Sequence, residues 1–228
     1  WHSFNVGDYV LRLMDNTIGF CSNPTSRPSG STIVGIVISD SSPRANDPSL
    51  PSTCSHGIAL GLGEGAAGSW ISSTDNGPVY NWTGANGYIS TAGCYYANSW
   101  EGVVRNEQGK LPLGYNNTTA LKKFIDAHSG LTSPMITSLN QYSTNLPTDA
   151  SSWYIPSIAE MDFITAQSST LNNLLSAAGG TQLSNTNYWT SSEQANQQSW
   201  APYINPISGT LNSHSKTNSH PVRFVFAF

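Results

Sequence analysis

Charged side chains are scarce in this chain of 228 residues. Asp, Glu, Lys and Arg make up 10% of it, whereas an average soluble domain holds about 25%. The net charge is −4 and no run of Lys or Arg occurs, so the basic patch that marks a nucleic-acid-binding protein is absent. Solubility must therefore come from Ser, Asn, Thr and Gln.

Long apolar runs are missing as well. No stretch approaches the roughly 18 apolar residues that a membrane-spanning helix needs, so we expect no membrane insertion of this domain. No signal peptide is visible, but the chain begins with Trp1 rather than Met, which suggests a processed product whose leader has been removed. Few Lys and Glu, abundant Ser, Asn and Thr, seven Trp and ten Tyr are typical of secreted or cell-surface proteins.

Cysteine is rare and shows no metal-binding pattern. Cys21, Cys54 and Cys94 are three in number, so a monomer leaves at least one unpaired. A Cys54–Cys94 disulfide and three idle thiols both remain open, and the second is favoured. Because no Cys or His cluster has ligand spacing, the sequence predicts neither a metal site nor a cofactor.

Motifs of known catalytic chemistry are weak or absent. Residues 63–68 match G-x-G-x-x-G, but a dinucleotide site needs a helix to follow, and residues 69–77 are poor helix formers. We therefore expect a turn-rich loop there. No G-x-S-x-G elbow of a serine hydrolase occurs, and Glu160 and Asp162 should point to different sides of one helix. No catalytic residue is predicted.

Periodicity predicts strands at both ends of the chain and helices between them. The first helix is expected over 119–128. The second begins at Ser157, where Ser157 and Glu160 fit the S-x-x-E capping box, and it continues with a further segment to the stop at 179–180. Residues 64–117 are rich in Gly and Asn, so we expect long irregular loops anchored by aromatic residues. Strands are expected at 6–13, 32–38, 56–62, 187–193, 199–205, 210–214 and 221–228, all in a single domain spanning 1–228.

The last sixty residues combine rigid anchors with a neutral polar stretch. Between Phe163 and Val222 the only charged residues are Glu193 and Lys216. We expect a structural hydrogen-bonding role for Glu193 and core positions for Trp153, Trp189 and Trp200. The candidate ligand-contacting residues, whose alternative interpretation is solvated loops, are Asn187, Asn196, Ser199, Tyr203, Asn205, Asn212, His214, Asn218 and His220.

Four of these C-terminal segments resemble a known family. They are S-W-Y-I-P-S-I-A-E-M (152–161), Y-W-T-S-S-E (188–193), S-W (199–200) and V-R-F-V (222–225). The set is similar to the lectin-like C-terminal domain of bacterial surface and pilus-tip adhesins of the Bacteroidales type. The opening segments V-G-D-Y (6–9) and I-V-G-I-V (33–37) are also similar to that family.

This resemblance implies an α+β, C-type-lectin-like fold, in which two helices pack on a small, twisted, mainly antiparallel sheet with long loops. The terminal strands should lie close together. The E-P-N, Q-P-D and W-N-D motifs of calcium-dependent lectins are absent, so calcium is not expected. Formylglycine-generating enzymes share the broad fold but rely on cysteines late in the chain, and none follows Cys94.

Some lectin-like proteins are diversified by retroelements that randomise adenines in a C-terminal variable region. Such variation yields Asn, Ser, Tyr, His, Thr, Asp or Gly, and residues 185–220 are rich in this set. An ordinary Ser- and Asn-rich surface is the alternative. On the first interpretation Gln194, Gln197 and Gln198 are unvaried positions.

The function expected from these features is a non-enzymatic adhesin or receptor-binding module at the bacterial cell surface. Its partner would be a protein or glycan on another cell, with pilus subunits as a further option. The alternatives are a formylglycine-generating or glycan-acting enzyme, which needs a reactive cysteine or two close carboxylates, and a structural pilus-tip subunit.

Overall fold

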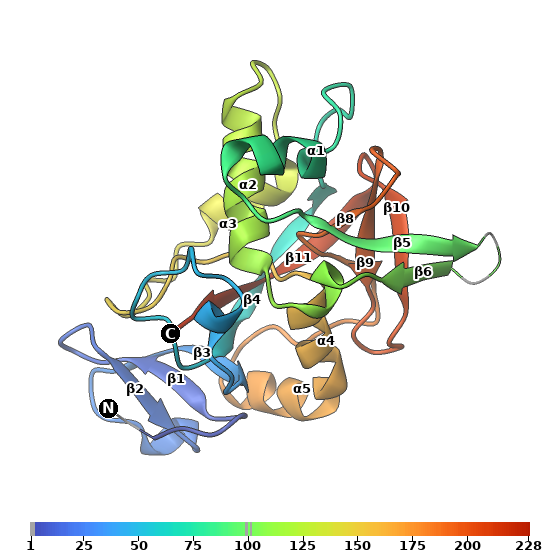
Figure 1. The fold of residues 1–228 in the computed structure, drawn as a ribbon. Helices are drawn as coiled ribbons and strands as arrows, with labels where there is room; N and C mark the ends of the chain where they lie inside the picture. Colours follow the sequence, from blue (N-terminus) through green and yellow to red (C-terminus); the bar gives the residue numbers. More distant parts are fainter. Residues whose placement is uncertain (1–2, 99, 101) are drawn as a thin grey trace.

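The computed structural model describes residues 3–98, 100 and 102–228. Within those residues the chain is an α+β structure of five α-helices and three sheets (Figure 1). The strands are β1 (Tyr9–Arg12), β2 (Ile18–Cys21), β3 (Thr32–Ser39), β4 (Ile58–Ser69), β5 (Ala92–Asn98), β6 (Gly102–Arg105), β7 (Tyr188–Trp189), β8 (Glu193–Gln194), β9 (Trp200–Ile204), β10 (Leu211–Ser215) and β11 (Ser219–Ala227). The helices are α1 (Val79–Thr83), α2 (Gly114–Asp126), α3 (Pro134–Gln141), α4 (Ile158–Ala166) and α5 (Ser168–Ala177), with 3₁₀ turns η1 (Pro24–Ser26), η2 (Pro43–Ala45), η3 (Gly84–Asn86) and η4 (Gln108–Lys110).

The central sheet has five strands in the order β11-β4-β3-β1-β2, all antiparallel to their neighbours. The last strand confirms its predicted alternation, because Val222, Phe224, Phe226 and Phe228 belong to the apolar cluster on one face of the sheet. The residue between two of them, Val225, belongs to the cluster on the other face. The closing strand therefore joins both halves of the core.

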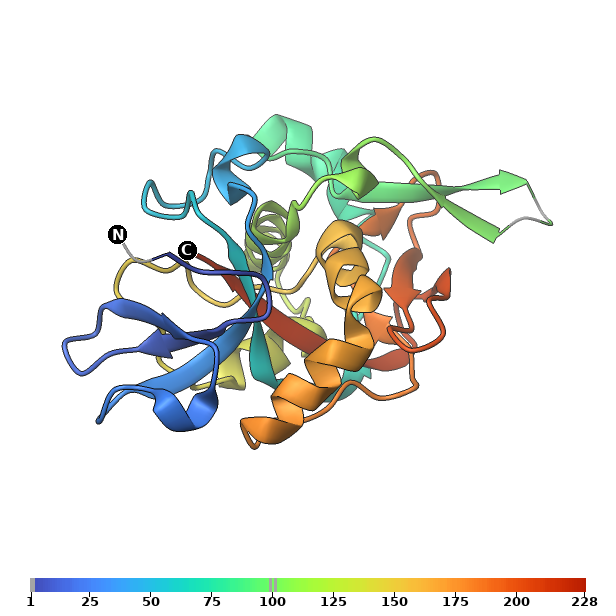
Figure 2. The ribbon, with the colours of Figure 1, turned by 90° about the horizontal axis from the view of Figure 1, so that it is seen from below.

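Helices cover both faces of this sheet (Figures 1 and 2). On one side α3 packs against β4 and β11, and on the other α4 and α5 pack against β3. The predicted helix at 119–128 lies largely within α2, and the second predicted helix is the pair α4 and α5. The expectation of two helices was wrong, since α1 and α3 are additional. Ser133-Pro134 marks the start of α3, with the Ser133 hydroxyl accepting from the Ile136 N–H.

The capping box at Ser157 is present in sequence but bonds differently from the prediction. Ser157 is the N-cap of α4, and its hydroxyl donates to the Glu160 carboxylate. That carboxylate also accepts from the Gly114 N–H at 2.8 Å. Glu160 thus links the first turn of α4 to the start of α2.

The Gly-rich segment expected to be a turn-rich loop is instead part of strand β4. A Cβ at Gly61 would lie 2.8 Å from the Trp153 ring, and one at Gly63 would lie 2.9 Å from the Tyr142 ring. Glycine is required here because these aromatic rings lie directly on the strand. The expectation of irregular structure over 64–117 was therefore wrong in part, since this region also holds α1, β5, β6 and the start of α2.

Two smaller sheets of three strands complete the fold, in the orders β10-β9-β7 and β6-β5-β8. Strands β5 and β6 form an antiparallel hairpin that projects from the body (Figures 1 and 2), and β8 pairs in parallel with the base of β5. The terminal strands β1 and β11 share the central sheet with β3 and β4 between them. Near the chain ends, the Phe4 and Phe228 rings are in contact, with centroids 5.2 Å apart.

All three cysteines are free thiols, so a Cys54–Cys94 disulfide is excluded. Within the residues that the structure describes, no helix is long and apolar enough to cross a bilayer.

Candidate binding surface

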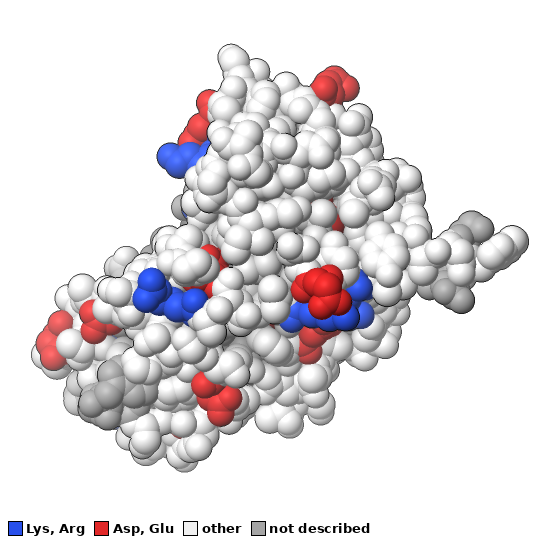
Figure 3. Space-filling view, in the orientation of Figure 1, with Lys and Arg blue, Asp and Glu red and all other residues white. Residues whose placement is uncertain are grey.

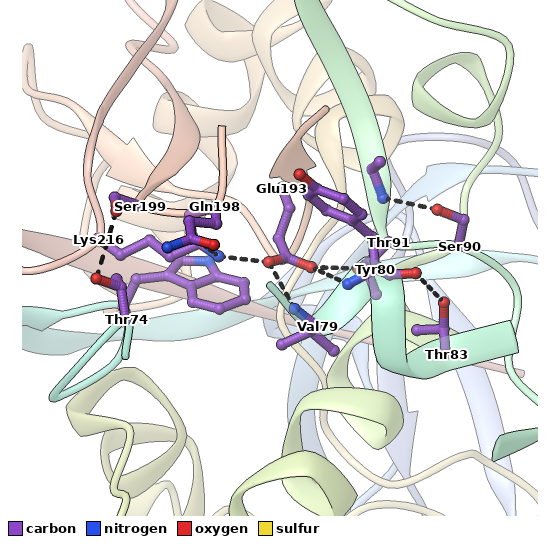
Figure 4. A network of polar contacts seen from close by, with 12 residues as sticks. Thr74, Val79, Tyr80, Thr83, Ser90, Thr91, Glu193, Gln198, Ser199 and Lys216 are labelled. Carbon is purple, nitrogen blue, oxygen red and sulfur yellow. Dashed lines mark hydrogen bonds and ion pairs between the residues drawn. The ribbon is translucent and has the colours of Figure 1, made fainter. Parts of the chain in front are cut away.

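The two charged residues of the C-terminal polar stretch form a buried ion pair (Figure 4). The Glu193 carboxylate accepts from Lys216 and from the N–H groups of Val79 at 3.0 Å and Tyr80 at 2.8 Å. The Lys216 ammonium also donates to the Gln198 carbonyl at 2.9 Å. The structural hydrogen-bonding role expected for Glu193 is confirmed, and the start of α1, the loop after β8 and the turn after β10 are fixed at one point.

The backbone and stem of Lys216 strengthen this junction. Its N–H donates to the Ser199 carbonyl at 2.7 Å, and its carbonyl accepts from the Trp70 N–H at 2.9 Å. The ammonium lies 4.7 Å from the centre of the Trp70 ring, within reach of a cation–π interaction. The loop at 195–199 therefore rests on a rigid frame.

Three of the predicted site residues meet in an aromatic cluster on β9, β10 and β11. Tyr203 contacts His214 and His220 at ring-centroid distances of 4.8 and 5.3 Å. The His214 Nδ1 and His220 Nε2 atoms lie 2.8 Å apart, and Trp189 packs edge-on against His220. Only 8% of Tyr203 is exposed, so its ring supports the two imidazoles from within and offers little area to a ligand.

The environment of this cluster disfavours the charged form of one imidazole. Burial, followed by the proximity of His214, lowers the pKa of His220 to about 4. At neutral pH His220 is therefore uncharged, and its hydrogen bond to His214 joins two neutral rings or one neutral and one charged ring. The face remains weakly charged, as the composition predicted.

The other predicted site residues are spread over three places. Asn205 closes the turn after β9 by accepting from the N–H groups of Ile207 and Ser208, and Ser199 bonds to Thr74. Asn187 is half-buried beside β7, and Asn218 is exposed in the turn after β10. The remaining two, Asn196 and Asn212, line hollows beside the β5–β6 hairpin.

Three open hollows border this hairpin. The first, about 680 Å³, lies at its base and is lined by Tyr95, Val103, Val104, Arg105, Asn106, Glu107 and Lys110. The second, which we call the Gln194 hollow, has about 440 Å³ and is lined by Tyr95, Tyr96, Gln194, Ala195, Asn196 and Gln197. The third, the Trp100 hollow, has about 670 Å³ and is lined by Tyr96, Asn98, Trp100, Gly102 and Asn212.

The hairpin exposes aromatic side chains. Trp100 is 92% exposed, and Tyr95 and Tyr96 are each 39% exposed. Tyr96 packs edge-on against Trp200, which is half-buried, so that the expected core position of this tryptophan is only partly filled. The arm carries no blue or red in Figure 3, although its grey atoms belong to residues outside the description, which include Glu101.

Sequence reasoning did not find this hairpin. The run A-G-C-Y-Y-A-N, followed after a short gap by G-V-V-R, carries the β-branched and aromatic residues and the Asn–Gly turn chemistry of a hairpin. The abundance of Gly and Asn around it favoured irregular loops instead.

The thiols are poorly suited to nucleophilic chemistry. Burial raises the pKa of Cys94 to about 12, and it also raises the pKa of Cys54. A thiol reacts as its thiolate, so both remain protonated and inert at neutral pH. In the described part of the chain, no group of three or more His, Cys, Asp or Glu residues is arranged to hold a metal ion.

Comparison with known proteins yields one informative similarity. No family model matches the chain, and no curated protein matches it. It is similar in structure to a fimbrial protein from Bacteroides ovatus ATCC 8483, with a TM-score of 0.72 and 21% sequence identity. The two chains share a fold. The match covers 100% of this chain and 49% of the fimbrial protein, so the chain spans about half the length of its structural neighbour.

Proposed function

We propose that this chain is a non-enzymatic, pilus-associated binding module of the bacterial cell surface. In this proposal residues 1–228 form a single C-type-lectin-like domain that presents a neutral polar and aromatic face to a protein or glycan on another cell. The observation that carries the proposal is the grouping of three hollows around the β5–β6 hairpin. The shared fold with a fimbrial protein supports the pilus association.

The composition of this face suits adaptable recognition. Exposed Tyr and Trp rings give contact area at low entropic cost, and Asn and Gln amides give hydrogen bonds that adjust to different partners. Asn196 and Asn212 would act together with Tyr95, Tyr96 and Trp100. The other predicted residues extend the face over β9 to β11, with Tyr203 supporting His214 and His220.

The finer proposal is that residues 185–220 vary between copies of the gene through a retroelement. The buried Glu193–Lys216 pair and the buried Trp189 provide a frame that would tolerate changes at exposed Asn and Ser positions. Sequencing these codons across a population of the source strain tests the idea. Changes should concentrate at Asn, Ser, Tyr and His codons with Gln194, Gln197 and Gln198 fixed, and a uniform sequence would rule variation out.

Cell binding tests the main proposal. Fluorescently labelled protein should bind to host epithelial cells or to neighbouring bacteria, and Trp100→Ser should weaken that binding because it removes the most exposed ring. Met14→Ser is the matched control, since Met14 is 79% exposed on the turn between β1 and β2. Equal binding by the two variants would contradict the assigned face. The absence of cell binding would favour a structural pilus subunit.

A further inference from the structure

A buried amide without a partner lies beside the hairpin. Gln194 is the last residue of β8, and its side chain is completely buried. Neither its Oε1 nor its Nε2 has a hydrogen-bond partner among the described residues. Leaving such a group unsatisfied costs about 1–3 kcal/mol, and native proteins seldom retain one without a reason.

The strand geometry opens a space at this amide. β5 and β8 run in parallel only as far as the Cys94–Gln194 pair, where the Cys94 carbonyl accepts from the Ala195 N–H at 2.7 Å. Beyond this pair β5 continues into the hairpin, while the chain after β8 turns away. The Gln194 hollow lies where the two strands part. Because alternate residues of a strand direct their backbone groups to the same edge, Tyr96 faces the same side as Cys94.

The lining of the hollow defines the chemistry of a ligand. None of its residues is ionisable near neutral pH: they are two tyrosines, three amides and one alanine. The nearest charged residue in sequence, Glu193, is already paired with Lys216. An anion or cation would lose its hydration and meet no opposite charge. The ligand that fits is neutral and carries hydrogen-bond donors and acceptors side by side.

We propose that the Gln194 hollow is a subsite for a neutral sugar, an assignment that rests on the binding function proposed above. The Gln194 amide offers one acceptor and two donors, which match the neighbouring hydroxyls of a sugar ring. Asn196 and Gln197 add amides at the rim, and the half-exposed rings of Tyr95 and Tyr96 receive the C–H faces of the sugar. The volume of about 440 Å³ is in the range of small-ligand sites.

An extended peptide added beside β5 fits less well. Strand addition needs a regular edge several residues long, whereas the pairing of β5 becomes irregular between Tyr96 and Asn98. A compact ligand uses the buried amide without requiring that edge. Calcium has no role in this subsite, because its lining contains no carboxylate.

The test uses the whole chain on an array of neutral, sialylated and sulfated glycans, followed by titration with the best neutral sugar. Gln194→Met keeps the side-chain length and removes the unsatisfied amide, so folding stability should be unchanged or higher. We expect binding of at least one neutral glycan, unaffected by EDTA, that weakens at least about tenfold in Gln194→Met because two hydrogen bonds are lost. Gln182→Met, which changes an exposed glutamine outside the hollow, should bind like the unaltered chain.

Three results would overturn the sugar subsite: no glycan binds, only acidic glycans bind, or Gln194→Met retains full affinity. Binding of extended peptides in place of sugars would assign the hollow to strand addition. The general binding function is judged separately by the cell assay. If cells are bound and Gln194→Met binds them normally, the sugar subsite fails while the binding module stands.

Discussion

The Lys216 ammonium bonds the Glu193 carboxylate in the interior, where the two side chains are 2% and 0% exposed. These residues lie 23 positions apart, and together they fix the loop that carries Asn196. A buried pair of this kind need not stabilise the fold more than apolar residues would, but the loss of one partner leaves an uncompensated charge.

Lys216→Met should therefore destabilise the chain by about 3–5 kcal/mol, because it keeps the apolar stem over Trp70 but removes the cation from Glu193. Urea unfolding measures the change. The double variant with Glu193→Gln should recover much of the loss, since no buried charge is left. Lys110→Met serves as the control, because the Lys110–Glu107 pair is exposed and should contribute less than about 1 kcal/mol. A similar cost for both lysines would contradict the buried-pair interpretation.

Glu160 should make stability fall as the pH rises through neutrality. Burial raises the pKa of this carboxyl to about 7, against hydrogen bonds from Ser157 and Gly114 that lower it. A raised pKa in the folded state means that its contribution is complete below the unfolded value near 4.5 and is lost as the pH rises through about 7.

Glu160→Gln removes this titration while its amide oxygen can still accept from Gly114. Its stability relative to the unaltered chain should rise between pH 5 and pH 8 by on the order of 2–3 kcal/mol. Thermal unfolding at both pH values checks this, with Glu107→Gln, an exposed carboxyl, as the control. Parallel pH profiles for the unaltered chain and Glu160→Gln would show that Glu160 does not titrate in this range.

His220 should act in the opposite direction at acid pH. Its pKa of about 4 in the folded chain lies below the usual 6.5, so stability is complete above about 6.5 and is lost as the pH falls toward 4. The groups that face it, Trp189, Tyr203 and His214, supply no negative charge. NMR titration of the imidazole C–H signals should place His220 near 4, and His214→Gln should raise that value by removing a neighbouring charge. Titration of His220 near 6.5 would contradict the packing described here.

Gly109→Ala should loosen the base of the hairpin. A Cβ at this position would lie 1.8 Å from the Gly93 carbonyl oxygen of β5, a backbone atom that cannot rotate away. We expect a loss of about 2–3 kcal/mol in urea unfolding. Gly84→Ala is the control, because its Cβ would meet nothing within 4 Å and its φ is −61°, so its stability should be unchanged or slightly higher. Equal effects would place Gly109 away from β5.

The alternation of apolar residues located the closing strand, and a β-branched run located β3, because each pattern reflects the local backbone that its residues prefer. Ser157 marked the start of α4 for the same reason. Scarcity of charge and the lone Glu193 in a polar stretch correctly indicated a structural role for that residue. These features depend on neighbours within a few positions, so the sequence by itself determined them.

Tertiary packing decided the rest. Gly61 and Gly63 became part of a strand because distant aromatic rings lie on them, and Glu160 reached α2 instead of completing its own capping box. The hairpin with Trp100, the meeting of His214 with His220, and the isolated amide of Gln194 all depend on segments far apart in the chain. A residue's partners across such separations are set by how whole elements pack, which local periodicity does not encode.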